Sequence, residues 1–87
     1  MTTVYNPDEA RSFAKWLEEE CGQLSLDVRE ASREMVELQA NWRDWKYDYY
    51  TLVFDECTLK VMEFVNDAEA YVGYLRKKAD LVDEFLT

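Results

Sequence analysis

Trp42-Arg43-Asp44-Trp45 is the stretch at which the apolar pattern of this 87-residue chain changes register. On each side of it, apolar residues recur at alternating steps of four and three, the period of 3.5 residues typical of a helix in a coiled coil. Continued past Trp45, the first pattern requires an apolar residue at Glu56, so it fails there. The two patterns therefore belong to different helices, and the chain reverses between about positions 41 and 47.

Each segment has one continuous apolar row at this spacing. The first row consists of Ala10, Ala14, Leu17, Cys21, Leu24, Val28, Ala31, Met35, Leu38, Trp42 and Trp45. The second consists of Tyr47, Tyr50, Phe54, Cys57, Val61, Phe64, Ala68, Tyr71, Leu75, Lys78, Val82 and Phe85. Because Trp42 and Trp45 end the first row, we expect them to close the end of the fold by packing rather than to bind a ligand.

The sequence predicts an all-α fold. Asn6 is a good N-cap, Pro7 suits the first helical position, and either Asn41 or Asp44 can cap a second helix. We expect a single domain over residues 1–87, folded as an antiparallel two-helix hairpin with helices at about 7–41 and 45–86. The alternative is one helical rod of about 80 residues.

The second segment carries more apolar surface than one partner helix covers. Val65, Val72, Ala79 and Leu86 form a further row at intervals of seven residues. A stripe of this width marks an interface, so we expect the hairpin to dimerise into a four-helix bundle, with itself or with a related helical hairpin. The predicted interface residues are Phe64, Val65, Tyr71, Val72, Leu75, Ala79, Val82 and Leu86.

The composition argues against several classes of protein. The net charge of −9 opposes binding to nucleic acid and to anionic membrane surfaces. No apolar run approaches the roughly 18 residues of a membrane-spanning helix, so we expect no membrane insertion. The first residues have neither the basic nor the apolar region of a Sec signal peptide. A hydrophobic content of 48% excludes simple disorder.

No pattern in the sequence indicates catalysis. The absence of histidine removes the usual general base and the usual neutral metal ligand. Neighbouring carboxylates on a helix point about 100° apart and do not converge on one ion, so we expect no enzyme, no metal and no cofactor. Cys21 and Cys57 are expected to be small buried residues rather than a disulfide, which fits a reducing compartment. We therefore expect a cytoplasmic protein; the alternative is secretion without a Sec signal peptide.

The chain resembles the WXG100 (ESAT-6-like) superfamily of small bacterial helical hairpins, with Trp42-Arg43-Asp44 in the place of the Trp-x-Gly turn motif. Aromatic residues follow early in the second helix, at Tyr50 and Phe54. The resemblance implies hairpins that pair into four-helix bundles and that act as substrates, partners or chaperones of type VII secretion. Asp44 replaces the glycine of the motif. The Tyr-x-x-x-Asp/Glu secretion signal is missing, because Lys78 follows Tyr74 at the position of the acidic residue, so either a partner carries the signal or the protein is not exported.

Three functions follow from these observations. The first is a non-enzymatic interaction module, a dimeric partner or adaptor in a bacterial secretion or toxin system. The second is an exported substrate of type VII secretion. The third is an acidic immunity protein or antitoxin whose negative charge attracts a basic toxin.

Overall fold

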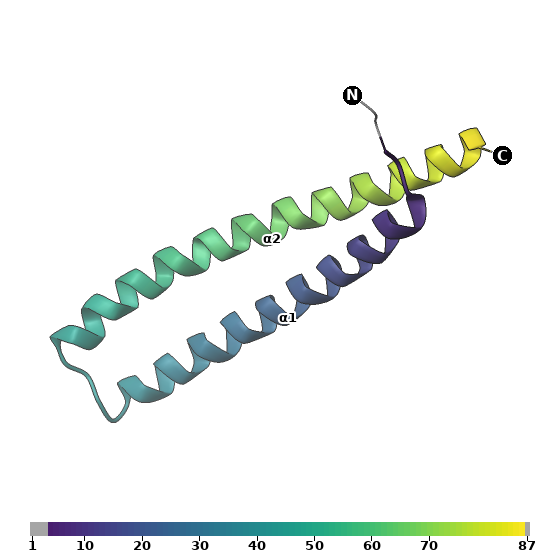
Figure 1. Ribbon diagram of the computed structural model, residues 1–87. Helices are drawn as coiled ribbons and strands as arrows, with labels where there is room; N and C mark the ends of the chain where they lie inside the picture. Colours follow the sequence, from purple (N-terminus) through teal and green to yellow (C-terminus); the bar gives the residue numbers. More distant parts are fainter. Residues whose placement is uncertain (1–3, 87) are drawn as a thin grey trace.

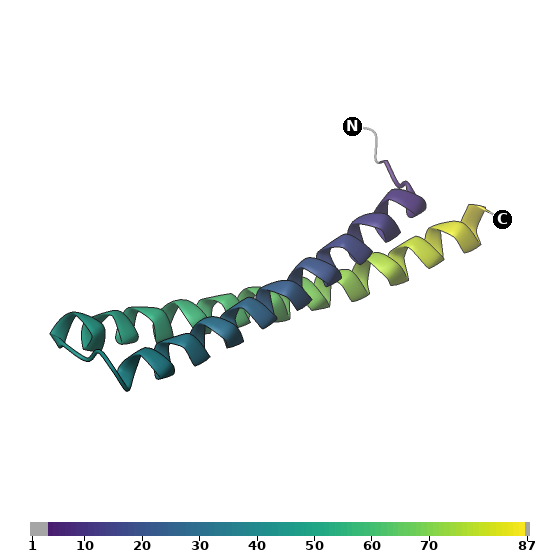
Figure 2. The same ribbon diagram turned by 90° about the horizontal axis from the view of Figure 1, so that it is seen from below.

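The chain folds into two antiparallel helices, α1 (Pro7–Gln39) and α2 (Trp45–Leu86). The computed structural model describes residues 4–86, and for Leu86 the backbone alone. The helices run side by side from the turn to the end at which both termini lie (Figure 1), and they cross at a shallow angle (Figure 2). The predicted hairpin is confirmed, and the alternative of a single rod is wrong. The molecule is a slender body of 63 × 24 × 14 Å.

Local side-chain bonds set the start of α1. The Glu9 N–H donates to Asn6 Oδ1 at 3.2 Å, and Pro7 occupies the first helical position, as predicted. The helix ends at Gln39, two residues before the predicted boundary. There the N–H groups of Asn41 and Trp42 both donate to the Leu38 carbonyl, at 3.0 and 2.8 Å, which tightens the last turn and ends the helix.

Asp44 starts α2. Its Oδ1 accepts the Tyr47 N–H at 2.8 Å, and its carbonyl accepts the Asp48 N–H at 3.1 Å. Of the two predicted caps, Asn41 and Asp44, the structure therefore uses Asp44. No residue in the described range 4–86 has a positive φ. The connection between the helices consequently has no backbone conformation that requires glycine, which explains why the hairpin closes with aspartate at position 44.

The core between the helices is narrow and built from small side chains. Its buried residues are Ala14 and Cys21 on α1 and Val65, Ala68, Val72 and Ala79 on α2. Small residues at these positions let the two helices approach closely. Cys21 is 3% exposed, as predicted, whereas Cys57 is exposed, contrary to the prediction that both cysteines are buried.

Ion pairs hold one flank of the hairpin. Arg11 contacts Asp80 at 2.8 Å and Asp83 at 2.6 Å, and Arg76 contacts Glu18 at 2.8 Å. The hydrogen bond and the charge of Arg76 lower the pKa of Glu18 below its ordinary value. Each exposed pair contributes little energy by itself. Together they make this flank of the hairpin polar.

Candidate interaction surface

Three rows of side chains on α2 explain where its apolar surface lies. Two combinations of rows on α2 could form its contact with α1, which we call the seam, and one row is common to both. This shared row consists of Tyr47, Phe54, Val61, Ala68, Leu75 and Val82. An inner row turns toward α1: Thr51, Thr58, Val65, Val72 and Ala79. An outer row directly precedes the inner row in sequence: Tyr50, Cys57, Phe64, Tyr71 and, further along, Phe85. Each outer residue therefore points about 100° away from its inner neighbour, and all of these outer residues are exposed.

The hairpin closes with the shared and inner rows. Val65, Val72 and Ala79 are 9%, 4% and 2% exposed, because they pack against α1 within the same chain. The sequence analysis assigned these three residues to contact with a second chain, and the structure corrects that assignment: they have almost no surface left to offer. The physical reason is size, since valine and alanine allow close helix packing that phenylalanine and tyrosine prevent.

The remaining predicted interface residues lie differently. Phe64 and Tyr71 are 56% and 50% exposed on the outer row. Leu75 and Val82 are half-buried at the border between the seam and the outer row. The side chain of Leu86 lies outside the described residues. Whether these residues contact another chain stays a prediction.

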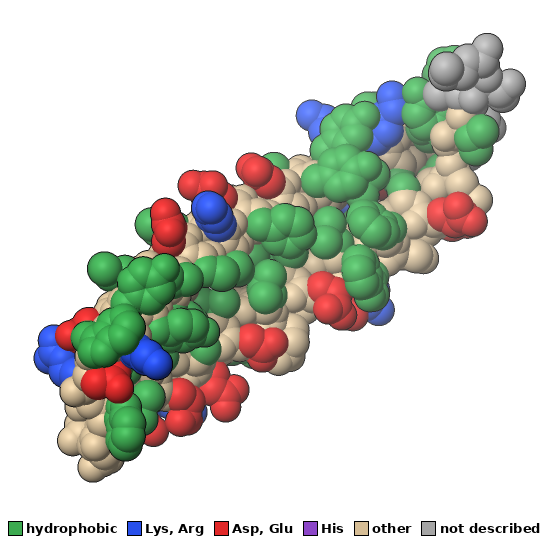
Figure 3. All heavy atoms as spheres, turned by 60° about the vertical axis from the view of Figure 1, so that its left-hand side comes forward, with side chains coloured by type: hydrophobic (Ala, Val, Ile, Leu, Met, Phe, Trp, Pro, Cys, Tyr) green, Lys and Arg blue, Asp and Glu red, His purple; other side chains and the backbone are tan. Residues whose placement is uncertain are grey.

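The outer row widens into a mostly apolar face, which Lys60 and Asp67 interrupt near its middle. Val53, Tyr74 and Leu81 adjoin it on the side away from the ion pairs and are 41%, 57% and 54% exposed. We call this set the apolar face: Tyr50, Val53, Cys57, Phe64, Tyr71, Tyr74, Leu81 and Phe85. Figure 3 shows a face of the hairpin on which hydrophobic side chains extend over much of its length, with acidic side chains along its edges.

At the turn end, the apolar face reaches Trp42. Trp42 is 64% exposed, its Nε1–H donates to Asp44 Oδ2 at 3.2 Å, and it borders an open hollow together with Leu38 and Tyr50. Trp45 is 74% exposed and is the first residue of α2, not the last rung of the first row. The two tryptophans therefore do not close the end of the single hairpin by burial, contrary to expectation.

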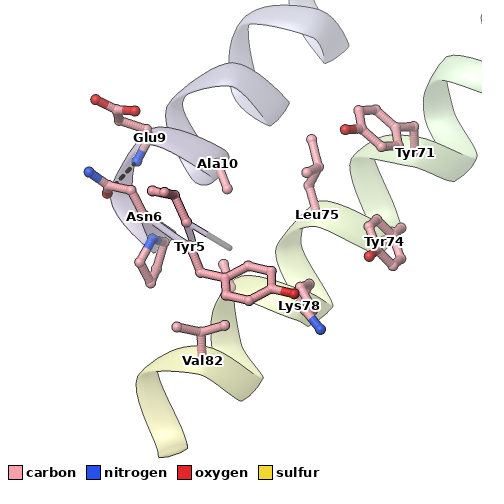
Figure 4. A pocket seen from close by; sticks show the side chains of 12 residues that line it. Tyr5, Asn6, Glu9, Ala10, Tyr71, Tyr74, Leu75, Lys78 and Val82 are labelled. Atoms are coloured by element: carbon pink, nitrogen blue, oxygen red, sulfur yellow. Dashed lines mark hydrogen bonds between the residues drawn. The ribbon is translucent and has the colours of Figure 1, made fainter. Parts of the chain in front are cut away.

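At the open end, a second hollow lies on the same face. Tyr71 and Tyr74 line it with their rings stacked at a centroid distance of 6.0 Å. The segment before α1 forms its other wall: Tyr5 lies across α2 beside Lys78, as Figure 4 shows. The Lys78 Nζ is 4.9 Å from the centre of the Tyr5 ring. The Lys78 side chain is half-buried, so its aliphatic stem lies along apolar surface while its ammonium group reaches water.

The hairpin exposes more surface to solvent than a compact protein of the same mass. It exposes 7367 Å², whereas a compact monomer of 10.4 kDa exposes about 5,400 Å². The excess is about 2,000 Å² per chain by the same relation. No large side chain in the described part is fully buried. The slender hairpin thus leaves many of its large apolar side chains uncovered.

The described residues offer little else that a ligand could use. Over residues 4–86 there is no group of three or more His, Cys, Asp or Glu side chains placed to hold a metal ion. No helix in this range is both long enough and apolar enough to cross a membrane. The apolar face is therefore the candidate site.

Solved structures with this fold are known, although no protein-family model and no curated protein sequence matches the chain. Two are structures of EsxB, a secreted protein of Bacillus anthracis strain Sterne. A point mutant of EsxB is 13% identical, with a TM-score of 0.82 over 100% of this chain and 97% of that one. The selenomethionine-labelled EsxB is 14% identical, with a TM-score of 0.82 over the whole of both chains. The fold expected from the resemblance is confirmed: the chain has the helical-hairpin fold of these two structures.

Proposed function

We propose that this protein is a non-enzymatic interaction module, a dimeric partner or adaptor in a bacterial secretion or toxin system. Its apolar face is covered by a second helical hairpin, and the two hairpins form a four-helix bundle. The observation that carries this proposal is the exposed, mostly apolar face from Tyr50 to Phe85, set against buried residues that, in the described range, are all small or of medium size.

The excess surface of the whole hairpin is large enough for a stable pairing. Two hairpins that each cover an excess of about 2,000 Å² bury about 4,000 Å² in total, within the range of obligate dimers and above the roughly 1,600 Å² of a standard complex. Obligate interfaces are also the more apolar class. The aromatic residues of the face suit this role, since phenylalanine and tyrosine contribute large areas at a small entropic cost.

Analytical ultracentrifugation of the purified chain tests the proposal. We expect a dimer at micromolar concentration, and we expect Phe64→Glu to shift it toward monomer. Leu59→Glu is the matched control. Leu59 is 63% exposed, against 56% for Phe64, but it lies on the side of α2 that points away from α1 and is not part of the apolar face. A wild-type hairpin that is well folded and monomeric contradicts the proposal, as does an equal loss of dimer in both variants.

Export is a second candidate function, because the similarly folded EsxB is a secreted protein. On this candidate the protein leaves the cell in a complex whose other member supplies the Tyr-x-x-x-Asp/Glu signal. The test is immunodetection in culture supernatant of the native host, with and without its type VII secretion ATPase, and with a cytosolic enzyme as the lysis control. Equal amounts outside the cell in both strains exclude this candidate.

A further inference from the structure

Burial divides the hairpin into two halves along its length. We call residues 7–23 of α1 and 65–86 of α2 the open half, and residues 24–39 of α1 and 45–64 of α2 the turn half. Among the described residues, those that are buried all lie in the open half: Ala14, Cys21, Val65, Ala68, Val72 and Ala79. No residue of the turn half is buried. The packing that holds α1 against α2 is therefore concentrated at one end of the molecule.

The polar contacts between the helices follow the same division. The ion pairs that join α1 to α2, made by Arg11 and Arg76, lie in the open half. The ion pairs formed by the described residues of the turn half do not join α1 to α2. One hydrogen bond crosses between the helices there, from the Tyr47 hydroxyl to the Met35 carbonyl at 2.8 Å. Charge therefore adds to the packing of the open half and leaves the turn half without such support.

The inner row of α2 changes character at the boundary between the halves. It contains Val65, Val72 and Ala79 in the open half, but Thr51 and Thr58 in the turn half. Thr51 donates its hydroxyl to a carbonyl of its own helix at 2.9 Å, whereas the half-buried Thr58 hydroxyl has no hydrogen-bond partner within residues 4–86. A half-buried hydroxyl gains less from packing than a methyl group and is stabilised by access to water. The seam is therefore weaker in the turn half.

A cleft of about 460 Å³ begins at the same boundary and extends into the turn half. Its lining includes Val28 and Ser32 of α1 and Thr58, Val61 and Met62 of α2. Ser32, like Thr58, is half-buried and has no hydrogen-bond partner in the described part of the chain. Side chains that border such a space lose the contacts that close packing gives them. The cleft therefore lies where α1 and α2 hold each other least.

From these observations we propose that the turn half is a built-in opening segment, over which α1 and α2 separate as a unit while the open half stays closed. Helices of this length without a packing partner are marginal in water, so separation also breaks their backbone hydrogen bonds. The cluster of Cys21, Val65 and Ala68 holds the helices together at the boundary. The opened state makes Val28 and Val61 accessible while the molecule remains folded. The opening occurs within one chain, so it does not depend on the proposed association.

Hydrogen exchange of the full chain, followed residue by residue by NMR, tests the proposal. Amides of the turn half exchange through its opening alone, whereas the most protected amides of the open half exchange only through complete unfolding. After correction for intrinsic rates, the most protected amides of the turn half should exchange at least about thirtyfold faster than those of the open half. Their rates should not depend on protein concentration, because the opening is intramolecular. Equal protection in the two halves, or turn-half rates that rise on dilution, overturns the proposal.

Two reciprocal substitutions in the inner row sharpen the test. Val72→Thr places a hydroxyl in the half that stays closed when the turn half opens. It should accelerate exchange in the open half about tenfold and leave turn-half rates within about twofold of wild type. Thr58→Val removes a hydroxyl from the segment that opens. Because its contacts are lost both on opening and on complete unfolding, it should slow exchange in both halves by the same factor, about threefold or more.

The opposite responses to these substitutions contradict the opening segment. If Val72→Thr accelerates both halves equally, the hairpin opens as one unit. If Thr58→Val slows the open half alone, the turn half exchanges without separation of the helices at position 58. Cys21→Ser makes a corresponding change in α1, where Cys21 is 3% exposed. It carries the same expectation as Val72→Thr and replaces that variant if Val72→Thr does not fold.

Discussion

Replacing Asp44 by alanine should destabilise the hairpin although the side chain is exposed. Asp44 Oδ1 accepts the N–H of Tyr47, the third residue of α2, at 2.8 Å, and Oδ2 accepts the indole N–H of Trp42 at 3.2 Å. The substitution removes both bonds while leaving the backbone conformation available to alanine. It therefore isolates the contribution of the carboxylate at the turn.

The magnitude follows from two terms. Loss of an N-cap of this kind costs about 1 kcal/mol, within a range of about 0.5–2. Loss of a negative charge at the positive end of α2 adds about 0.3–1 kcal/mol. The free energy of unfolding should thus fall by about 1.5 kcal/mol, which lowers Tm by about 6–12 °C for a domain of this size. Asp44→Asn retains the cap but loses the charge term and the exposed bond from Trp42, because its amide nitrogen cannot accept the indole N–H. Asp44→Gly, which restores the glycine of the WXG100 motif, should cost a few tenths of a kcal/mol for the cap in addition to the charge term.

The assay is urea unfolding followed by circular dichroism at 222 nm. All variants are compared at one protein concentration, because association contributes to the measured stability. The expected order of stability is wild type, then Asn and Gly, then Ala. If Asp44→Ala unfolds at the same urea concentration as Asp44→Asn, the carboxylate does not cap α2 in solution. If Asp44→Gly is more stable than wild type, the turn prefers a conformation other than the one described here.

Three further outcomes are expected. Trp42→Ala should lower the stability of the hairpin by no more than about 1 kcal/mol in urea unfolding, because its side chain is 64% exposed; a loss of 3 kcal/mol would contradict this. Ala14→Leu should cost about 1–3 kcal/mol, because position 14 is 0% exposed in the seam, while Ala70→Leu at an exposed position should cost almost nothing. The lowered pKa of Glu18 should rise toward its ordinary value in Arg76→Gln, as measured by NMR titration. A lowered pKa stabilises the folded state at pH values above the ordinary value near 4.3. This stabilisation is lost as pH falls through the pKa of the folded state. In Arg76→Gln, the contribution of Glu18 to the pH dependence of stability should therefore disappear.

The turn and the helix starts could be predicted from the sequence because local chemistry decides them. Asn6 with Pro7, and Asp44 ahead of Tyr47, supply cap atoms within three residues of the N–H groups that need them. The change of register, which the failure of the first pattern at Glu56 reveals, can also be found from the sequence alone. The end of α1 was placed two residues late, because the closing bonds of Asn41 and Trp42 to the Leu38 carbonyl leave no mark in the apolar pattern.

The pairing face of α2 could not be predicted in the same way. The inner row and the outer row of α2 can each combine with the shared row, which contains Val61 and Ala68. Either combination gives apolar residues at alternating steps of three and four. The outer row has the larger apolar side chains, Phe64 and Tyr71, against Val65 and Val72 in the inner row. Apolar area alone therefore favours the outer row as the face that packs against α1. The structure selects the inner row, since the closeness of two packed helices depends on side-chain size as well as on apolar character.

This choice of rows divides the sequence between folding and binding. With the small row inside, the hairpin closes tightly but buries little area, so the aromatic row remains exposed and is the surface that the proposed function assigns to a second hairpin. With the aromatic row inside, Phe64 and Tyr71 would hold α2 away from the small residues Ala14 and Cys21 of α1, and the hairpin would lose the contacts that fix its register. Substitutions at Val65 should therefore act first on the stability of the single hairpin, whereas substitutions at Phe64, its neighbour in sequence, should act on association. Because the largest apolar residues of α2 lie outside the core of the hairpin, the proposed association and the stability of the hairpin depend on different rows of the same helix.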